Sequence, residues 1–141
     1  MIKRLRCVLI AVKDFDQAVD RFAGVLGVKP KVVEFQAEGI KSAVFPIGDS
    51  AVELISPAKP GIPVDKFLSS RGEGLFAISL EVDDIDESMK MLEANDVRLL
   101  AQEPQVDELG YRYVYSHPKS LHGVEVEFTE PPPSTPGVSA V

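Results

Sequence analysis

The sequence contains an internal repeat that spans about half of its 141 residues. The segment "IAVKDFDQAVDRFAGVLGV" is repeated in outline by "LEVDDIDESMKMLEANDV", with matched residues 70 positions apart. A constant offset of this length indicates two copies of one supersecondary unit. The matched pairs are Val12 and Val82, Asp14 and Asp84, Asp16 and Asp86, and Phe45 and Tyr115.

Both halves predict the same order of elements: a strand, a helix and three further strands. Cys7 to Val12 is an apolar run typical of a buried strand, Asp14 can cap the next helix, and Gly27 ends it. Later strands are expected at "KVVEF", "SAVFPI" and "AVELIS", and again at "VRLL", "YRYVYS" and "VEVEF". We therefore predict an α+β fold in which two βαβββ repeats form one curved, incomplete barrel with a concave cleft.

These elements predict a single domain over residues 1–130, followed by a tail over residues 131–141. Repeat one covers about 3–56, a linker about 57–73, and repeat two about 74–129. Within the linker, "DKFLSSR" is expected to form one or two helical turns. The tail is rich in proline and serine and too polar to pack a core, so we expect it to be disordered or loosely attached.

The composition argues against two classes of partner. The net charge of −7 and the pI near 4.8 argue against nucleic acid and anionic membrane surfaces, which need a basic patch. Cys7 is the only cysteine, so no internal disulfide can form, as is usual inside cells. The apolar run near the start is too short to span a membrane. We expect a cytoplasmic protein.

Several stretches carry a resemblance to a known family: "IAVKDFDQAVDRFAGVLGV", "FPIGDSAVELISP", "KFLSSRGEGL", "LEVDDIDESMKMLEANDVRLL" and "SHPKSLHGVEVEF". In order and spacing they resemble the vicinal oxygen chelate superfamily, which includes glyoxalase I, bleomycin-resistance proteins and extradiol dioxygenases. Within it, the chain is most similar to the methylmalonyl-CoA epimerases. The resemblance covers most of residues 5 to 128 and implies the vicinal oxygen chelate fold and a homodimer.

The resemblance also implies a metal site, and this chain departs from it. Epimerases of this kind hold a divalent metal with a His on the first strand of each half, a Gln or Glu on the fourth strand and a Glu on the eighth. The matching positions here are Cys7, Ala77, Glu53 and Glu127. Alanine offers no ligand, so we expect no metal. If a metal does bind, its ligands would be Glu53, Glu127 and the Cys7 thiolate.

Glu53 and Glu127 are the candidate catalytic residues. Each lies inside an apolar strand, in "AVELI" and "VEVEF". One interpretation is that these strands expose a polar face to water. The resemblance instead places both carboxylates in the cleft, where they can share a proton as an acid–base pair or bind a cationic ligand. The resemblance also implies a second acidic residue near the third strand, which assists the reaction, and its position here falls on Ala37 or Glu38.

Four more residues are candidates for substrate binding. His117, Lys119 and Ser120 lie in "SHPKSLHG", where donors can contact a carboxylate or phosphate, and Arg71 in the linker can meet coenzyme A phosphates. The alternative for each is an ordinary solvated surface residue.

Three functions remain open from the sequence. The loss of both histidines favours a diverged, metal-free protein that binds a small carbonyl or CoA-thioester-like ligand. Such a protein need not be an enzyme; if it is active, an epimerase or a glyoxalase-type lyase is expected. The alternatives are a metal-dependent epimerase or lyase, and a small-molecule binding protein like those of bleomycin resistance.

Overall fold

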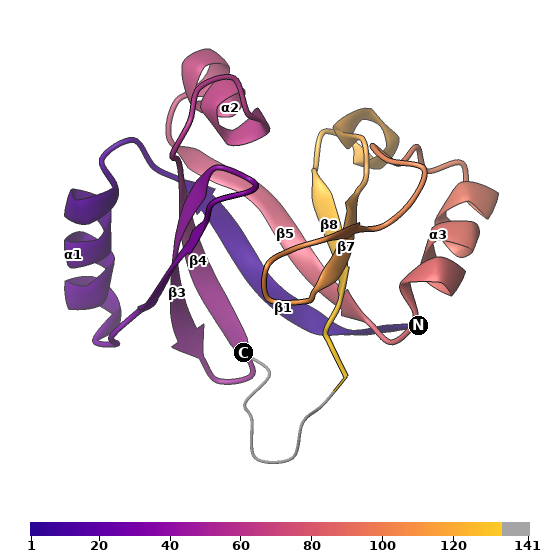
Figure 1. Cartoon of the computed structure of the whole chain (residues 1–141), viewed down its shortest axis with the longest axis horizontal. Coiled ribbons are helices and arrows are strands. Elements are labelled where there is room, and N and C mark those ends of the chain that lie inside the picture. Colours follow the sequence, from indigo (N-terminus) through magenta and orange to yellow (C-terminus); the bar gives the residue numbers. More distant parts are fainter. Residues whose placement is uncertain (134–141) are drawn as a thin grey trace. The chain divides into compact units, whose positions relative to one another are not determined.

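The computed structural model describes residues 1–133 of the chain and contains two compact units (Figure 1). The first-repeat unit is Cys7–Phe76, and the second-repeat unit combines Met1–Arg6 with the described residues from Ala77 on. The elements in chain order are β1 (Ile2–Ala11), α1 (Phe15–Leu26), β2 (Lys31–Phe35), β3 (Ile40–Ile47), β4 (Ser50–Pro57), α2 (Pro63–Arg71), β5 (Gly74–Val82), α3 (Ile85–Ala94), β6 (Gln105–Val106), β7 (Arg112–Tyr115), a 3₁₀ helix (Pro118–Leu121) and β8 (Val126–Glu130).

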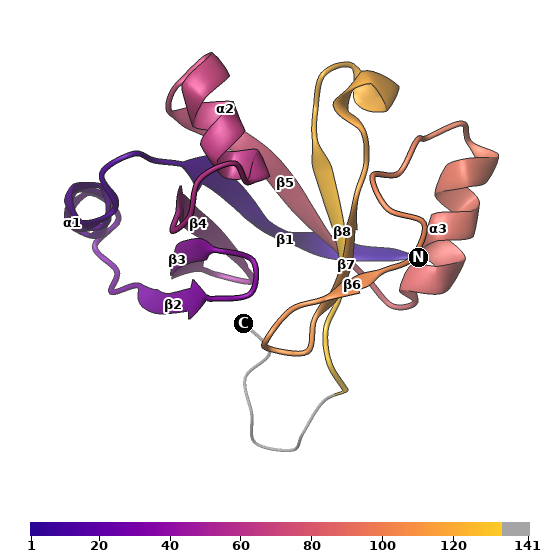
Figure 2. The same cartoon turned by 45° about the horizontal axis from the view of Figure 1, so that its top comes forward.

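The two units pair their strands in the same way. In the first-repeat unit the order is β2-β3-β4-β1, with antiparallel pairs except for β1, which runs parallel to β4. In the second-repeat unit the order is β5-β8-β7-β6, and β5 runs parallel to β8 (Figure 2). Residues 2–6 of β1 lie beside β5, where the Asp83 amide donates to the Met1 carbonyl at 3.3 Å. The α+β class and the two βαβββ repeats are confirmed.

One helix covers one face of the sheet in each unit. Because strand residues alternate between faces, every second residue of a strand points toward the helix. In the first-repeat unit, α1 packs on a core that contains Phe45 and Leu54, both fully buried. In the second-repeat unit, the core contains Val82, Val114 and residues of α3. The predicted carboxylates lie on the opposite face of each sheet, and in the first-repeat unit β4 also contacts α2.

The strand expected at "VRLL", residues 97–100, is wrong. Val97 turns inward and joins the core under α3, directly after Asp96, which has a positive φ of 61°. Only Leu99 forms a bridge, to Ser116, and the short strand β6 comes later, at Gln105–Val106. The turn at Asn95 and Asp96 leads directly into this segment, which pairs with the sheet at one residue instead of along a ladder. The helix in the linker is confirmed as α2, and residues 134–141 of the predicted tail lie outside the described part.

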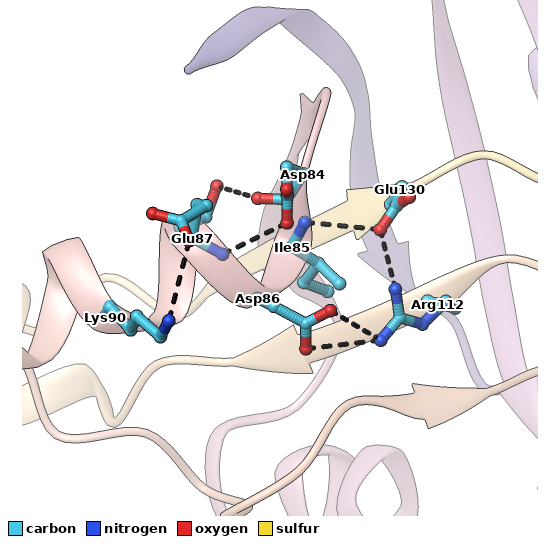
Figure 3. Close-up of polar contacts among 8 residues, drawn as sticks. Asp84, Ile85, Asp86, Glu87, Lys90, Arg112 and Glu130 are labelled. Carbon is cyan, nitrogen blue, oxygen red and sulfur yellow. Dashed lines mark hydrogen bonds and ion pairs between the residues drawn. The ribbon is translucent and has the colours of Figure 1, made fainter.

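Polar contacts fix the start of α3 to the sheet (Figure 3). The Asp84 carboxylate caps the helix by accepting from the Glu87 amide at 3.1 Å. Glu130 of β8 accepts from the Ile85 amide at 3.2 Å and from Arg112 at 3.0 Å. Arg112 also contacts Asp86, and this hydrogen bond raises the pKa of the guanidinium above its ordinary value. Among the helices of residues 1–133, none has the length and apolar character needed to cross a membrane.

We expect Asp84→Ala to lower the free energy of unfolding by about 1 kcal/mol, because the helix loses its side-chain cap. Urea denaturation followed by circular dichroism measures this. Glu93→Ala is the matched control, since Glu93 is exposed near the other end of α3, and it should change stability by less than about 0.5 kcal/mol. Equal stability of the two variants would contradict the role of the cap.

Candidate functional site

Glu127 is held on the face of the second-repeat sheet that points away from α3. It lies directly opposite Ser79 in the parallel pair of β5 and β8, and the Ser79 hydroxyl donates to its Oε1 at 2.6 Å. The Glu127 side chain is only 13% exposed, and Ser79 is fully buried. Ala77 comes two residues before Ser79 on the same strand and therefore shares this face.

Arg6 brings a positive charge to this carboxylate. Its Nη1 lies 4.0 Å from Glu127 Oε1, and its Cζ lies 4.5 Å from the centroid of the Tyr111 ring. The Arg6 side chain is 19% exposed. A planar guanidinium stacked on an aromatic ring gains a cation–π attraction and loses conformational freedom. Arg6 is therefore a positioned cation beside a half-buried carboxylate.

Charged and aromatic side chains continue along the same side of the second-repeat unit. Tyr115 of β7 lies opposite Glu127, and its ring packs edge-on against Tyr113 at 6.0 Å between centroids. Arg4 and Glu81 form a second ion pair, at 3.3 Å. The helix-side residues of these strands are apolar by contrast. A face with partly exposed charges and tyrosines is suited to a polar ligand rather than to further core packing.

In the first-repeat unit, Cys7 and Glu53 share a face of the sheet. Cys7 lies opposite Ala51, and Leu9 lies opposite Glu53 in the parallel pair of β1 and β4. This face points away from α1, whose core is formed by the alternate residues. Cys7 is 2% exposed and Ala51 is 6% exposed. The alternative interpretation, that the strand of Glu53 exposes a polar face to water, is therefore not supported.

The predicted metal residues are divided between the two units. Cys7 and Glu53 belong to the first-repeat unit, and Ala77 and Glu127 belong to the second. Within residues 1–133, no group of three or more His, Cys, Asp or Glu side chains is gathered as a metal ion would need. The pairing of Glu53 with Glu127 as an acid–base couple stays a prediction.

The "SHPKS" loop is shaped by its own predicted binding residues. His117 Nδ1 accepts from the Lys119 amide at 3.1 Å, and Ser120 Oγ accepts from the Arg98 amide at 2.9 Å. The Lys119 side chain is exposed. These contacts give His117 and Ser120 a role in holding the loop, while ligand binding by this loop stays a prediction. Arg71 lies in the other unit, with its guanidinium 5.8 Å from the Phe67 ring.

A groove in the first-repeat unit was not predicted from the sequence. It has a volume of about 510 Å³ and lies where β1 leads into α1, beside the end of β4. Two lysines and two aspartates line it, so it carries no strong net charge. The sequence did not predict it, because its walls combine the start of α1 with residues of β3 and β4 that are distant in the sequence. Its lining residues are Lys13, Asp14, Phe15, Asp16, Lys41, Ser56 and Pro57.

Arg6 and Ser79 were also missed. Ser79 could have been found, because it lies two residues after Ala77 and so shares the face of the predicted metal position. No comparable sequence pattern indicates the role of Arg6. It precedes the predicted metal position Cys7, but its contact with Glu127 depends on the fold of strands far apart in the sequence.

We expect Ser79→Ala to lower the free energy of unfolding by about 1.5–3 kcal/mol, because a half-buried carboxylate loses a charged hydrogen bond. Ser42→Ala is the matched control. Ser42 is equally buried on β3, but within residues 1–133 its hydroxyl has no hydrogen-bond partner. Its removal should be neutral or slightly stabilising. Urea denaturation of both variants checks the difference, and equal losses would contradict the assigned role of Ser79.

Comparison with known proteins agrees with this architecture. Residues 8–115 match the model of the Glyoxalase/Bleomycin resistance protein/Dioxygenase superfamily. The mitochondrial methylmalonyl-CoA epimerase of Dictyostelium discoideum is 32% identical over 131 residues, which cover 92% of this chain and 79% of that protein. A variant of the Streptomyces coelicolor methylmalonyl-CoA epimerase, in complex with 2-nitronate-propionyl-CoA, superposes with a TM-score of 0.86 at 27% identity, covering 92% of this chain and 98% of that one.

A further structure, of a methylmalonyl-CoA epimerase in complex with methylmalonyl-CoA and NH4+, covers 100% of both chains with a TM-score of 0.87 at 26% identity. The similarity therefore extends over both repeats in sequence and in structure. The chain belongs to the Glyoxalase/Bleomycin resistance protein/Dioxygenase superfamily, also called the vicinal oxygen chelate superfamily, as an epimerase-like member.

Proposed function

We propose that this protein binds a CoA thioester, or a similar small carbonyl compound, without the divalent metal of its family. The ligand class is supported by its relatives, since two structures of similar fold hold acyl-CoA compounds. It is also supported by the polar face of the second-repeat unit, where Glu127, Arg6 and Tyr115 provide groups that can contact a carbonyl or carboxylate.

One observation carries the metal-free part of the proposal: the surroundings of Glu127. Its Oε1 accepts a hydrogen bond from Ser79 and lies 4.0 Å from the Arg6 guanidinium. A positive side chain at this distance opposes a divalent cation on the same carboxylate. Ala77 on the same face offers no ligand atom, and Cys7 is a buried thiol. The residues present do not fit the family's metal site.

A metal-dependent epimerase is the main alternative function. Epimerisation removes the proton from the carbon beside the thioester carbonyl and returns a proton to the opposite side of that carbon. It needs a base, an acid and a group that stabilises the enolate oxygen. With a metal bound, Glu53 and Glu127 would be its ligands. Without a metal, they are the candidate acid and base, and they are proposed for that role only together. A bleomycin-resistance type of binding is the second alternative, in which no chemistry follows.

We further propose a homodimer and a cytoplasmic location. The resemblance to the family implies a homodimer, and the single free cysteine is usual for a protein inside cells. The homodimer and the cytoplasmic location stay predictions. Sedimentation velocity of the purified protein measures the assembly directly.

The metal-free proposal predicts how the purified, untagged protein behaves in two measurements. Elemental analysis should find divalent metals well below one ion per chain. Calorimetric titration with methylmalonyl-CoA should give the same affinity with and without a chelator, because no ion takes part in binding. A stoichiometric metal whose removal abolishes binding would overturn the proposal and favour the metal-dependent epimerase.

If the protein is an enzyme, a carboxylate pair should control exchange of the hydrogen beside the thioester. In deuterated buffer, we expect Glu53→Gln combined with Glu127→Gln to slow this exchange about 10²–10⁴-fold, since a positioned acid or base contributes a factor of this size. Glu93→Gln on the exposed surface of α3 is the control. Nuclear magnetic resonance of the thioester follows the exchange, and an unchanged rate in the double variant would exclude these residues as acid and base.

A further inference from the structure

We propose that Arg6 supplies, as part of the chain, the positive charge that a bound ion would otherwise bring to Glu127, and that it binds an anionic oxygen of the ligand. This inference rests on the proposed function, because it assigns the group that recognises the ligand at the same site. It makes the preferred ligand a thioester that also carries a free carboxylate.

The position of Arg6 is the first argument. Its guanidinium is stacked on Tyr111, which is itself 7% exposed, and it lies beside the half-buried Glu127. The ring contact holds the end of a long side chain that would otherwise be mobile. A charge fixed in this way does not have to be ordered when a ligand arrives, so less of the binding free energy is lost.

The second argument compares two ion pairs of the same unit. Arg4 contacts Glu81 with two nitrogens, at 3.3 and 3.4 Å, as a two-point pair. Arg6 approaches Glu127 through Nη1 at 4.0 Å, which is longer than a charge-assisted hydrogen bond. The short hydrogen bond to Glu127 comes from Ser79 instead. Arg6 thus compensates the charge of Glu127 from a greater distance than Arg4 does that of Glu81.

The third argument is the chemistry of the guanidinium. It stays protonated at any working pH, and its planar set of N–H donors matches the two oxygens of a carboxylate. Beside Glu127 it repels added cations and attracts anions. Tyr115 adds a hydroxyl group on the same side of the sheet. The site is therefore suited to a ligand that presents a carboxylate next to its thioester, rather than to a neutral acyl chain.

Ligand preference in defined variants tests the inference. Calorimetry in the presence of a chelator compares methylmalonyl-CoA, which has the additional carboxylate, with propionyl-CoA, which lacks it. The full chain should prefer methylmalonyl-CoA, and Arg6→Gln should reduce that preference about tenfold or more, since a charged hydrogen bond is lost. Arg4→Gln is the matched control and should keep the preference. Arg6→Lys keeps the charge but loses the planar donors, so it should retain part of the preference.

The outcomes separate this inference from the proposed function. If the unchanged protein binds both thioesters but Arg6→Gln weakens them equally, or Arg4→Gln has the same effect as Arg6→Gln, Arg6 is a structural residue and the inference fails alone. If the unchanged protein binds neither thioester, the proposed function fails. Titration with methylmalonate, the free dicarboxylate, then tests Arg6 independently: binding lost in Arg6→Gln but kept in Arg4→Gln supports the assignment, and no binding overturns it.

Metal uptake gives a second readout that does not depend on a ligand. Equilibrium dialysis with Co2+ should show stronger binding to Arg6→Gln than to Arg4→Gln, because only the first change removes the charge beside Glu127. Circular dichroism confirms that each variant folds. If Arg6→Gln does not fold, Arg6→Lys carries the test: a preference for methylmalonyl-CoA equal to that of the unchanged protein would contradict the need for the planar guanidinium.

Discussion

The parallel pairing of the first and last strand in each repeat is the constraint on which the remaining structure depends. It places Leu9 opposite Glu53 in one unit and Ser79 opposite Glu127 in the other. Because strand residues alternate between faces, the same pairing sends the neighbouring apolar residues toward the helix. One register therefore decides both the core and the polar face. A slip by one residue would move the carboxylates into the apolar core, where their burial without partners would be very costly.

Much of the fold could be predicted from the sequence, because the signals are local or repeated. The constant offset revealed two βαβββ units, and Asp14 and Asp84 both cap helices as expected. The prediction at residues 97–100 was wrong because a short apolar stretch has no periodicity that separates a strand from a core-filling turn. Val97 there belongs to the helix-side core.

The candidate site was harder to predict than the fold, and its residues show why. Glu127 was predicted as a site residue only because the sequence around its strand resembles the family, and that role stays a prediction. Ser79 acts through Glu127, which is 48 residues away in the sequence. Arg6 also acts through Glu127, and these two residues lie on the first and the last strand of the chain. Pattern and composition describe residues that are close in sequence. The register between distant strands, and the resting place of a long arginine side chain, follow only from the packed structure.

A side-chain cation such as Arg6 gives the site a different chemistry from that of a bound divalent ion. A divalent ion concentrates two charges and binds an oxygen directly, so it can stabilise an enolate strongly. A guanidinium spreads one charge over a plane and acts through hydrogen bonds, which suits recognition of a carboxylate more than polarisation of a thioester. Ser79 and Tyr111 then become the residues that keep both members of the Arg6–Glu127 pair in place. This division of roles favours a protein in which selective binding is retained and chemistry, if present, relies on its own carboxylates.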